Sequence, residues 1–172
     1  MITDAYLEQQ RLMHERHVYG NSGKKWASTV VKLAREIRAS SVLDYGCGTG
    51  ALIARVKVLA LELDVHEFDP AVIGKDDIPV DPADLVTCID VLEHIEPEQL
   101  DKVIKHIRSL TKKMLFAVVA TRAAGKKLPD GRNAHLIIEN RFWWMAKLGK
   151  HFAFTREWEQ RPGEWCVHLH PK

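Results

Sequence analysis

Continuous apolar runs alternate along the chain with stretches in which apolar side chains recur every three or four positions. The first pattern predicts buried strands, and the second predicts helices with one face against a core. The predicted strands cover residues 41–45, 65–69, 84–89 and 114–121. The predicted helices cover residues 24–40, 50–60, 96–110 and 139–150, with a shorter polar helix at 4–18.

The order of these elements predicts the fold class. Strands that alternate with helices form a parallel sheet joined by right-handed crossovers. Residues 152–159 and 164–170 flank an Arg-Pro-Gly turn and predict a closing antiparallel hairpin. Residues 72–83 are acidic and interrupted by prolines, which leaves room for only a stub of a further strand. We therefore expect an α/β, doubly wound, mostly parallel sheet with N-terminal helices and a C-terminal hairpin.

The sequence VLDYGCGTGAL at 42–52 runs from a strand into a glycine-rich turn. Glycine lets the backbone approach a ligand closely and adopt conformations that other residues avoid. Gly46 and Gly48, with Ala51, also satisfy the looser dinucleotide pattern G-x-G-x-x-G/A. A helix that begins near Gly50 would point free N–H groups at a phosphate or a carboxylate. The turn alone leaves the ligand undecided, and a tight turn without any ligand is the alternative.

Two acidic residues favour a ligand that carries positive charge and hydroxyl groups. Asp44 precedes the glycine turn, where a carboxylate would repel a pyrophosphate and attract an ammonium or sulfonium group. Asp69 ends the next predicted strand, a place from which an acid accepts hydrogen bonds from ribose hydroxyls. Glu67 is a second choice for that role. The alternatives are a buried Asp44 that holds the turn and an Asp69 that caps the turn before Pro70.

Composition and charge narrow the class of protein. The chain has 172 residues, of which 46% are hydrophobic and 28% are charged. Its formal net charge of +2 is too balanced to imply nucleic-acid binding on its own. No apolar run approaches the roughly 18 residues that span a bilayer. The three cysteines show no C-x-x-C spacing. We expect a cytoplasmic, reduced protein that does not associate with membranes.

The motifs LDYGCGTG, EFDP and DLVTCIDVLEHI, in this order, resemble those of small class I S-adenosylmethionine-dependent methyltransferases. The resemblance covers residues 40–120 and implies a Rossmann-like fold with S-adenosylmethionine as the cofactor. It implies one methyltransferase domain over residues 1–172: N-terminal helices at 1–40, a cofactor-binding core at 41–121 and an acceptor side at 122–172. The implied cofactor-binding residues are Tyr19, Asp44, Tyr45, Gly46, Cys47, Gly48, Gly50, Asp69, Pro70, Asp90, Val91 and Leu92.

Within this resemblance, the glycine turn would hold the methionine part of the cofactor, Asp44 its amino group and Asp69 its ribose. Tyr19, in a Gly-Asn-Ser-Gly turn, would lie over the cofactor, although a plain helix–helix turn is the alternative. The chain departs from the family in its short third strand. Asp76, Asp77 or backbone N–H groups would then face the adenine.

A hydroxyl or ammonium acceptor would need a general base, and His94 and His135 are the candidates, because histidine titrates near neutrality. The alternative for His94 is that it only holds the turn or the cofactor. His135 belongs to a polar loop cluster with Asp130, Arg132 and Asn133, for which a solvated surface is the alternative.

No metal is expected. In a strand, Cys166, His168 and His170 alternate onto one face and could bind a metal, but an edge strand that turns polar side chains to solvent is the preferred interpretation. For Trp143 and Trp144, packing in the core or a lid is preferred to stacking on an acceptor.

The resemblance implies an enzyme that transfers a methyl group to an unidentified acceptor. The chain leaves little room for a target-recognition domain, so a small molecule is favoured, while nucleic-acid and protein acceptors stay open. The Asn/Asp-Pro-Pro-aromatic motif of DNA amine methylation and the Pro-Cys pair of cytosine methylation are missing. The alternatives are a non-catalytic cofactor- or partner-binding module and a nicotinamide-dependent oxidoreductase, which would lack a Tyr-x-x-x-Lys pair.

Overall fold

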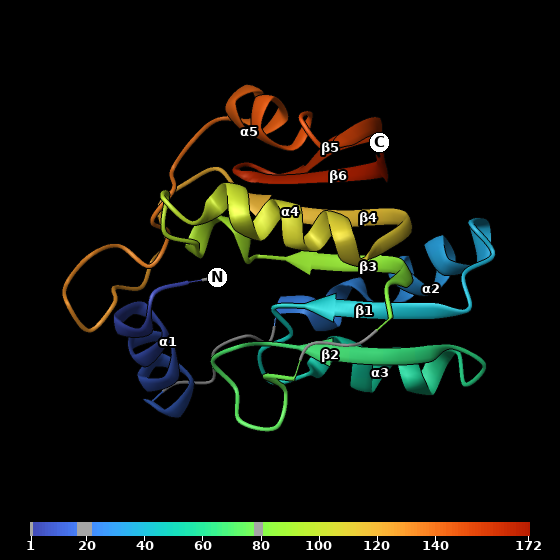
Figure 1. Ribbon diagram of the computed structural model, residues 1–172, viewed down its shortest axis with the longest axis horizontal. Helices are drawn as coiled ribbons and strands as arrows, with labels where there is room; N and C mark the ends of the chain where they lie inside the picture. Colours follow the sequence, from blue (N-terminus) through green and yellow to red (C-terminus); the bar gives the residue numbers. More distant parts are fainter. Residues whose placement is uncertain (1, 17–21, 78–80) are drawn as a thin grey trace.

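The computed structural model describes residues 2–16, 22–77 and 81–172. Its strands form one six-stranded sheet in the order β2-β1-β3-β4-β6-β5 (Figure 1). The strands are β1 (Ser41–Tyr45), β2 (Asp64–Phe68), β3 (Ala83–Ile89), β4 (Thr111–Ala120), β5 (Phe152–Arg161) and β6 (Glu164–Pro171). The first four are parallel, and β6 pairs antiparallel with both β4 and β5. The predicted doubly wound sheet with a closing hairpin is confirmed.

Helices cover both faces of this sheet. They are α1 (Asp4–Arg16), α2 (Ala27–Glu36), α3 (Ala51–Leu59), α4 (Leu100–Leu110) and α5 (Arg141–Leu148), with short 3-10 helices η1 (Ser22–Trp26) and η2 (Leu92–His94). Side chains of α4 and α5 share one core cluster, and those of α2 and α3 share the other. In Figure 1, α1 lies beyond the carboxyl ends of the parallel strands. No helix in the described ranges is long and apolar enough to cross a membrane.

The two clusters explain why the central strands are apolar on both faces. In β1, Val42 packs toward α2 and α3, whereas Leu43 packs toward α4. In β4, Phe116 faces the α2 side and its neighbours Leu115 and Ala117 face the α4 side. Successive side chains of a strand point to opposite faces, so a strand between two helix layers needs apolar residues at every position. Burial on both faces therefore explains the continuous apolar run that was predicted as a strand at residues 114–121.

The helix predicted over 96–110 begins at Leu100 instead. The preceding residues form a tighter turn, in which the Gln99 N–H donates to the Glu96 carbonyl (2.8 Å) and the Leu100 N–H to the Pro97 carbonyl (3.4 Å). These bonds span three residues rather than four, so Pro97 belongs to the approach to the helix and not to its first turn.

The expected stub of a third strand is absent from the residues described between β2 and β3. The chain there makes turns, in which the Val72 N–H donates to the Asp69 carbonyl (3.2 Å) and the Lys75 N–H to the Val72 carbonyl (3.0 Å). In this sheet β3 pairs with β1, and β2 forms the edge. The prolines and acids of this segment favour turns over a strand.

The preferred interpretation of Cys166 and His168 as side chains on a solvent-facing edge strand was wrong. The hairpin folds so that β6 lies between β4 and β5, and β5 forms the edge. Both side chains are therefore buried, and the His168 ring packs edge-on against Phe116 at a centroid distance of 5.5 Å. The apolar partners of β6, such as Leu169 against Leu115, drive this order because they fill the core.

Candidate active site

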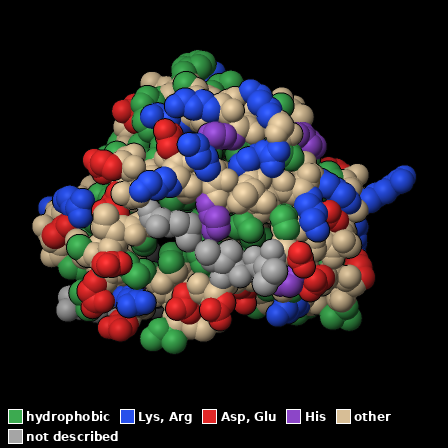
Figure 2. All heavy atoms as spheres, in the orientation of Figure 1, with side chains coloured by type: hydrophobic (Ala, Val, Ile, Leu, Met, Phe, Trp, Pro, Cys, Tyr) green, Lys and Arg blue, Asp and Glu red, His purple; other side chains and the backbone are tan. Residues whose placement is uncertain are grey.

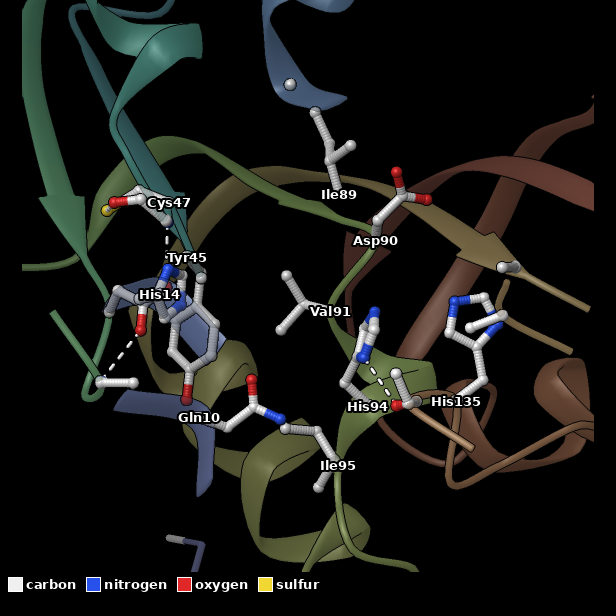
Figure 3. A pocket seen from close by; sticks show the side chains of 18 of the residues that line it. Gln10, His14, Tyr45, Cys47, Ile89, Asp90, Val91, His94, Ile95 and His135 are labelled. Atoms are coloured by element: carbon white, nitrogen blue, oxygen red, sulfur yellow. Dashed lines mark hydrogen bonds between the residues drawn. The ribbon is translucent and has the colours of Figure 1, made fainter. Parts of the chain in front are cut away.

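A cavity of about 430 Å³ opens at the carboxyl ends of the parallel strands (Figure 3). Its walls come from the glycine turn, from the segments after β2 and β3, from α1 and from the loop after β4. Of the predicted site residues, the lining includes Asp44, Tyr45, Gly46, Cys47, Gly48, Asp69, Pro70, Asp90, Val91, His94 and His135. The sheet thus brings together residues from five separate segments, as expected where ligands bind to doubly wound sheets.

Two predicted cofactor residues do not line the cavity. Gly50 does not line the cavity; it precedes α3 and adopts a left-handed conformation (φ +80°). Leu92 is fully buried in the core cluster beneath α4. Tyr19 lies outside the described residues. The adenine candidates Asp76 and Asp77 are exposed and are not part of the cavity lining.

The glycine turn wraps tightly around the end of β2 and against Val91. The N–H groups of Gly46 and Cys47 both donate to the Phe68 carbonyl (2.7 and 3.1 Å). Gly46 has a φ of +75°, and a Cβ atom added there would lie 2.4 Å from the Val91 Cγ2. The turn therefore needs glycine at this position for its backbone conformation and for the space that Val91 occupies.

Asp44 presents a buried carboxyl group at the end of β1. Only 4% of the residue is exposed, and the Thr87 hydroxyl donates to Oδ1 at 2.8 Å. Burial raises the pKa of Asp44 to about 7, and the nearby carboxylates of Glu67 and Asp69 also raise it. A cationic group in the cavity would reverse this effect by stabilising the ionised form.

Asp69 performs the turn-capping role that was its alternative. Its Oδ2 accepts from the Gly48 N–H (2.9 Å) and its Oδ1 from the Ala71 N–H (3.0 Å). A carboxylate has about four acceptor positions, so these two bonds leave capacity for hydroxyl groups in the cavity that it lines. Both interpretations of Asp69 are therefore compatible with the structure.

Glu67 holds Lys75 over the glycine turn rather than lining the cavity. The Lys75 Nζ lies 3.1 Å from the Glu67 Oε1 and 3.5 Å from the Gly48 carbonyl oxygen. A Cβ atom at Gly50 would collide with the ends of both side chains. This ion pair supports the turn from the side of β2.

The segment after β3 enters the site through a left-handed residue. Asp90 has a φ of +55°, which few residues other than glycine, asparagine and aspartate adopt, and its N–H donates to the Val118 carbonyl (2.9 Å). This conformation turns the chain from the strand into η2 and brings Val91 and His94 to the cavity wall.

His94 and His135 stand together on the side of the cavity away from the glycine turn (Figure 3). Their rings meet edge to face at a centroid distance of 4.8 Å. The Nδ1 of His94 bonds to the Ala134 carbonyl (2.8 Å), and the Nδ1 of His135 bonds to the Arg122 carbonyl (2.6 Å). Burial lowers the pKa of His94 to about 3 and also lowers the pKa of His135. Both imidazoles are therefore neutral at pH 7.

The rest of the loop cluster has a structural role. Asn133 accepts from the N–H groups of Ala124 and His135 through Oδ1 and so holds the loop against itself. Asp130 and Arg132 form an ion pair on the surface (2.7 Å). The alternative interpretation, a solvated surface loop, describes Asp130 and Arg132. Trp144 is buried in the core, which was the preferred interpretation for that residue.

Helix α1 supplies cavity residues that the sequence patterns do not predict. Tyr6, Gln10 and His14 all line the cavity. The Tyr6 hydroxyl donates to the backbone carbonyl of His94, and the Gln10 amide donates to the Tyr6 oxygen (2.6 Å). The spacing of Tyr6, Gln10 and Met13 on one buried face is the signal that could have found them, but the helix is mostly polar.

Replacing Tyr6 with phenylalanine should loosen α1 and widen the cavity. The change removes a donor to the His94 carbonyl and an acceptor for Gln10, so we expect unfolding free energy to fall by about 1–2 kcal/mol. Urea unfolding followed by circular dichroism measures this loss. An unchanged midpoint would show that α1 is held by its apolar contacts alone.

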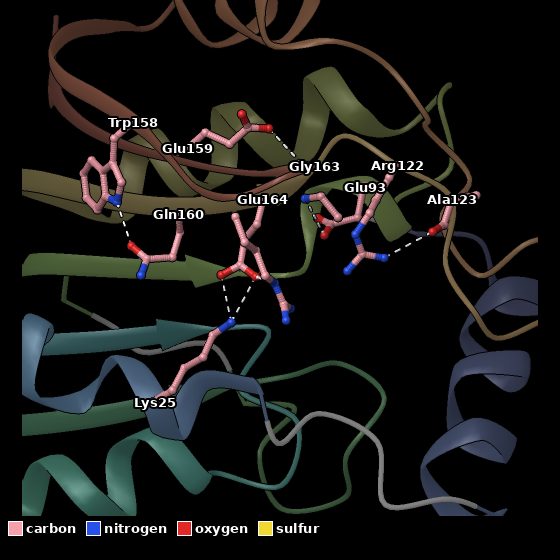
Figure 4. A network of polar contacts seen from close by, with 11 residues as sticks. Lys25, Glu93, Arg122, Ala123, Trp158, Glu159, Gln160, Gly163 and Glu164 are labelled. Carbon is pink, nitrogen blue, oxygen red and sulfur yellow. Dashed lines mark hydrogen bonds and ion pairs between the residues drawn. The ribbon is translucent and has the colours of Figure 1, made fainter.

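The hairpin closes the cavity on the remaining side through a network of charges (Figure 4). Glu164, only 2% exposed, accepts from Lys25 Nζ at 2.8 Å and from Arg161 Nε at 2.5 Å. This network joins η1 to the hairpin. A buried carboxylate with two cationic partners is satisfied, so Glu164 serves to hold the wall.

Comparisons with known proteins agree with this geometry. The chain is similar over 98% of its length to 88% of the Burkholderia thailandensis 1,6-didemethyltoxoflavin-N1-methyltransferase (15% identity, TM-score 0.72). The structure of the DhpI–SAH complex matches over 98% of both chains (17% identity, TM-score 0.64). The structure of LaPhzM matches all of this chain over 62% of the LaPhzM chain (16% identity, TM-score 0.67). A comparison with curated proteins found no significant match.

These structural likenesses establish the class I methyltransferase fold. A family model described as a methyltransferase domain matches residues 14–160, which include all four parallel strands. The same match leaves no support for the nicotinamide-dependent alternative. The chain belongs to the methyltransferase-domain family.

Proposed function

We propose that this protein transfers the methyl group of S-adenosylmethionine to a small-molecule acceptor. The observation that carries the proposal is the buried carboxyl group of Asp44, which faces the cavity beside the glycine turn. Its raised pKa would fall on contact with a cation, and S-adenosylmethionine carries both an ammonium and a sulfonium group. The Burkholderia thailandensis structure contains S-adenosylhomocysteine, which supports the same cofactor here.

The residues around the cavity fit the parts of this cofactor. Asp44 would pair with the amino group, and N–H groups of the glycine turn and the start of α3 would face the carboxylate. Asp69 would accept from the ribose hydroxyls beside its own bonds to the turn. Asp90 and Val91 would lie along the remainder of the cofactor. Because Asp76 and Asp77 do not line the cavity, backbone N–H groups are the better partner for adenine.

The chemistry asks the chain mainly to orient the acceptor and to exclude water. The methyl carbon of a sulfonium ion is already activated, so an in-line approach is the principal requirement, and such orientation supplies up to roughly 7–11 kcal/mol. The histidine pair lies on the side of the cavity away from the glycine turn, where it would face the acceptor. A pKa of about 3 makes His94 a poor base at neutral pH, which leaves His135 as the base candidate.

Three observations support a small acceptor. The cavity volume of about 430 Å³ lies in the range of roughly 300–1,000 Å³ that small-molecule sites occupy. On the face of the molecule drawn in Figure 2, Lys and Arg side chains lie mainly over the upper half, and Asp and Glu side chains lie mainly over the lower half. This face therefore shows no continuous basic track. The Burkholderia thailandensis structure also contains bound 1,6-didemethyltoxoflavin. A nucleic acid would be favoured by a basic track leading to the cavity.

Asp69→Ala should weaken cofactor binding more than tenfold. The variant loses the acceptor for the ribose hydroxyls and also the bonds that hold Gly48 and Ala71. Calorimetric titration with S-adenosylhomocysteine measures the change, with Asp64→Ala as the control because Asp64 is an exposed acid at the other end of β2. Equal affinities in the two variants would remove Asp69 from the cofactor site.

The acceptor class is tested by incubation with S-adenosylmethionine carrying a tritiated methyl group. Separate panels contain small aromatic hydroxyl compounds and amines, total RNA, and protein extract. We expect label in the small-molecule fraction. Label confined to RNA or protein would contradict the acceptor class, and no label in any panel despite cofactor binding would favour the non-catalytic module.

A further inference from the structure

Glu93, His94 and His135 offer three potential metal-ligand atoms that all lie within 4.8 Å of one another. The first two come from η2, and the third comes from the loop after β4. No local spacing in the sequence predicts this group, because the fold brings together residues far apart in the chain. The cluster is therefore a candidate metal site that the sequence does not predict.

The hydrogen bonds of the two histidines suit metal ligands. A carbonyl oxygen only accepts, so His94 Nδ1 and His135 Nδ1 must carry the protons that they donate to Ala134 and Arg122. The lone pair of each neutral ring is then on Nε2. Histidine ligands in metal sites are commonly held in this way, with the other ring nitrogen donating to a backbone carbonyl.

Glu93 adds an independent sign of a cation. Its side chain is completely buried, and Oε1 accepts from the Ala120 N–H at 2.9 Å. Oε2 is also buried and has no hydrogen-bond partner among the described residues. Leaving a buried carboxylate oxygen without a donor is costly, and a bound cation would satisfy it.

The surrounding charges permit a divalent cation. Asp90 and Arg122 are the charged groups that act on Glu93, one of each sign. Arg122 lies beside Glu93 at the end of β4 (Figure 4), but it is exposed and its Nη1 donates to the Ala123 carbonyl (3.3 Å). Once a bound cation favours the ionised form of Glu93, two carboxylates and one guanidinium would leave a net negative charge around the cluster.

We infer that Glu93, His94 and His135 bind one divalent first-row transition cation, of which Zn²⁺ and Co²⁺ are representative. Two imidazole nitrogens and one carboxylate oxygen suit this class, whereas Mg²⁺ and Ca²⁺ prefer oxygen ligands alone. Three protein ligands leave an open coordination position, which is characteristic of catalytic rather than structural sites.

The open position would face the cavity, because both histidines line it. An acceptor with a hydroxyl oxygen would complete the coordination, a consequence that rests on the proposed function. The lone pair of a metal-bound imidazole is no longer available to take up a proton. In this arrangement His135 is a ligand, and it is not the general base.

The test titrates EDTA-stripped, dialysed protein with Co²⁺ and separately with Zn²⁺, without any cofactor. We expect one equivalent to bind in the micromolar range or more tightly, with a visible Co²⁺ absorption band. Glu93→Gln and His135→Gln should each weaken binding at least about tenfold and reduce the band. His66→Gln is the control, because His66 lies on β2 beside Asp64 and away from the cluster.

Folding is checked separately by circular dichroism and by S-adenosylhomocysteine titration in EDTA. Glu93→Gln keeps the size of the side chain, so it remains informative if the histidine variant does not fold. Absence of stoichiometric binding by the wild-type protein would overturn the inference, and so would equal binding by Glu93→Gln. The cofactor titration in EDTA tests the proposed function on its own, so failure of one claim is distinguishable from failure of the other.

Discussion

Asp44→Asn is expected to weaken S-adenosylhomocysteine binding by about 30- to 100-fold at pH 8, the equivalent of a lost charged hydrogen bond of about 2–3 kcal/mol. The reason is that the ligand ammonium would lose its buried carboxylate partner, while the amide keeps the same shape and can still accept from Thr87. Calorimetric titration of both proteins measures the ratio. Affinity within threefold of wild type would place the ammonium elsewhere.

The pH dependence gives the same prediction a second readout. In the free protein Asp44 has a pKa raised to about 7, so it is largely protonated below that value. A ligand ammonium favours the ionised form, so wild-type affinity should rise with pH up to about 7 and level off above it, changing by up to about tenfold per unit below. The Asp44→Asn variant should lack this dependence between pH 5.5 and 7.5.

The folding stability of the ligand-free Asp44→Asn variant provides the control for the binding experiment. Its pKa is raised relative to the unfolded chain, so the free protein loses stability from this group as pH rises from about 4 to 7. The amide introduced by Asp44→Asn has no charge to bury. Urea unfolding of the ligand-free variant at pH 8 should therefore show equal or greater stability, which would separate a loss of binding from a loss of fold.

Gly46→Ala should destabilise the protein by about 2–4 kcal/mol, which combines left-handed strain with overpacking. The new Cβ would lie 2.4 Å from the Val91 Cγ2, and Val91 is a short side chain held between the turn and the core. Gly74→Ala is the matched control, because Gly74 has a similar φ (+81°) but no atom within 4 Å of its Cβ position.

The control should lose only about 1–2 kcal/mol, the cost of the left-handed conformation. Urea unfolding of the two variants measures the difference, which isolates the contact with Val91. Equal losses would mean that Val91 moves aside at no cost, and the tight packing between the glycine turn and the segment after β3 would not be required.

Local patterns predict much of this fold because its elements have strong periodicities. The strand at 114–121 and the helix at 96–110 were confirmed apart from their ends, since burial on both faces or on one face leaves a direct trace in the sequence. The position of β6 was not predicted. Strand order in a hairpin depends on which strand fills the core against β4, and this depends on contacts with Leu115 and other distant residues.

The residues of the candidate site also differ in how far the sequence predicts them. The glycine turn and Asp44 follow one another in the chain, so the sequence places them together, whereas Tyr6 reaches the site through the docking of α1. Glu93 was missed for another reason. Glu93 belongs to no local ligand spacing in the sequence, and it comes together with His94 and His135 only after the loop beyond β4 folds back.

We expect the cavity to bind S-adenosylmethionine and not a nicotinamide dinucleotide. Calorimetric titration of the wild-type protein at pH 8 with S-adenosylmethionine, and separately with NAD, tests it most directly. We expect one equivalent of S-adenosylmethionine to bind with a dissociation constant in the micromolar range, and no heat from NAD. Binding of NAD without any response to S-adenosylmethionine would contradict the account.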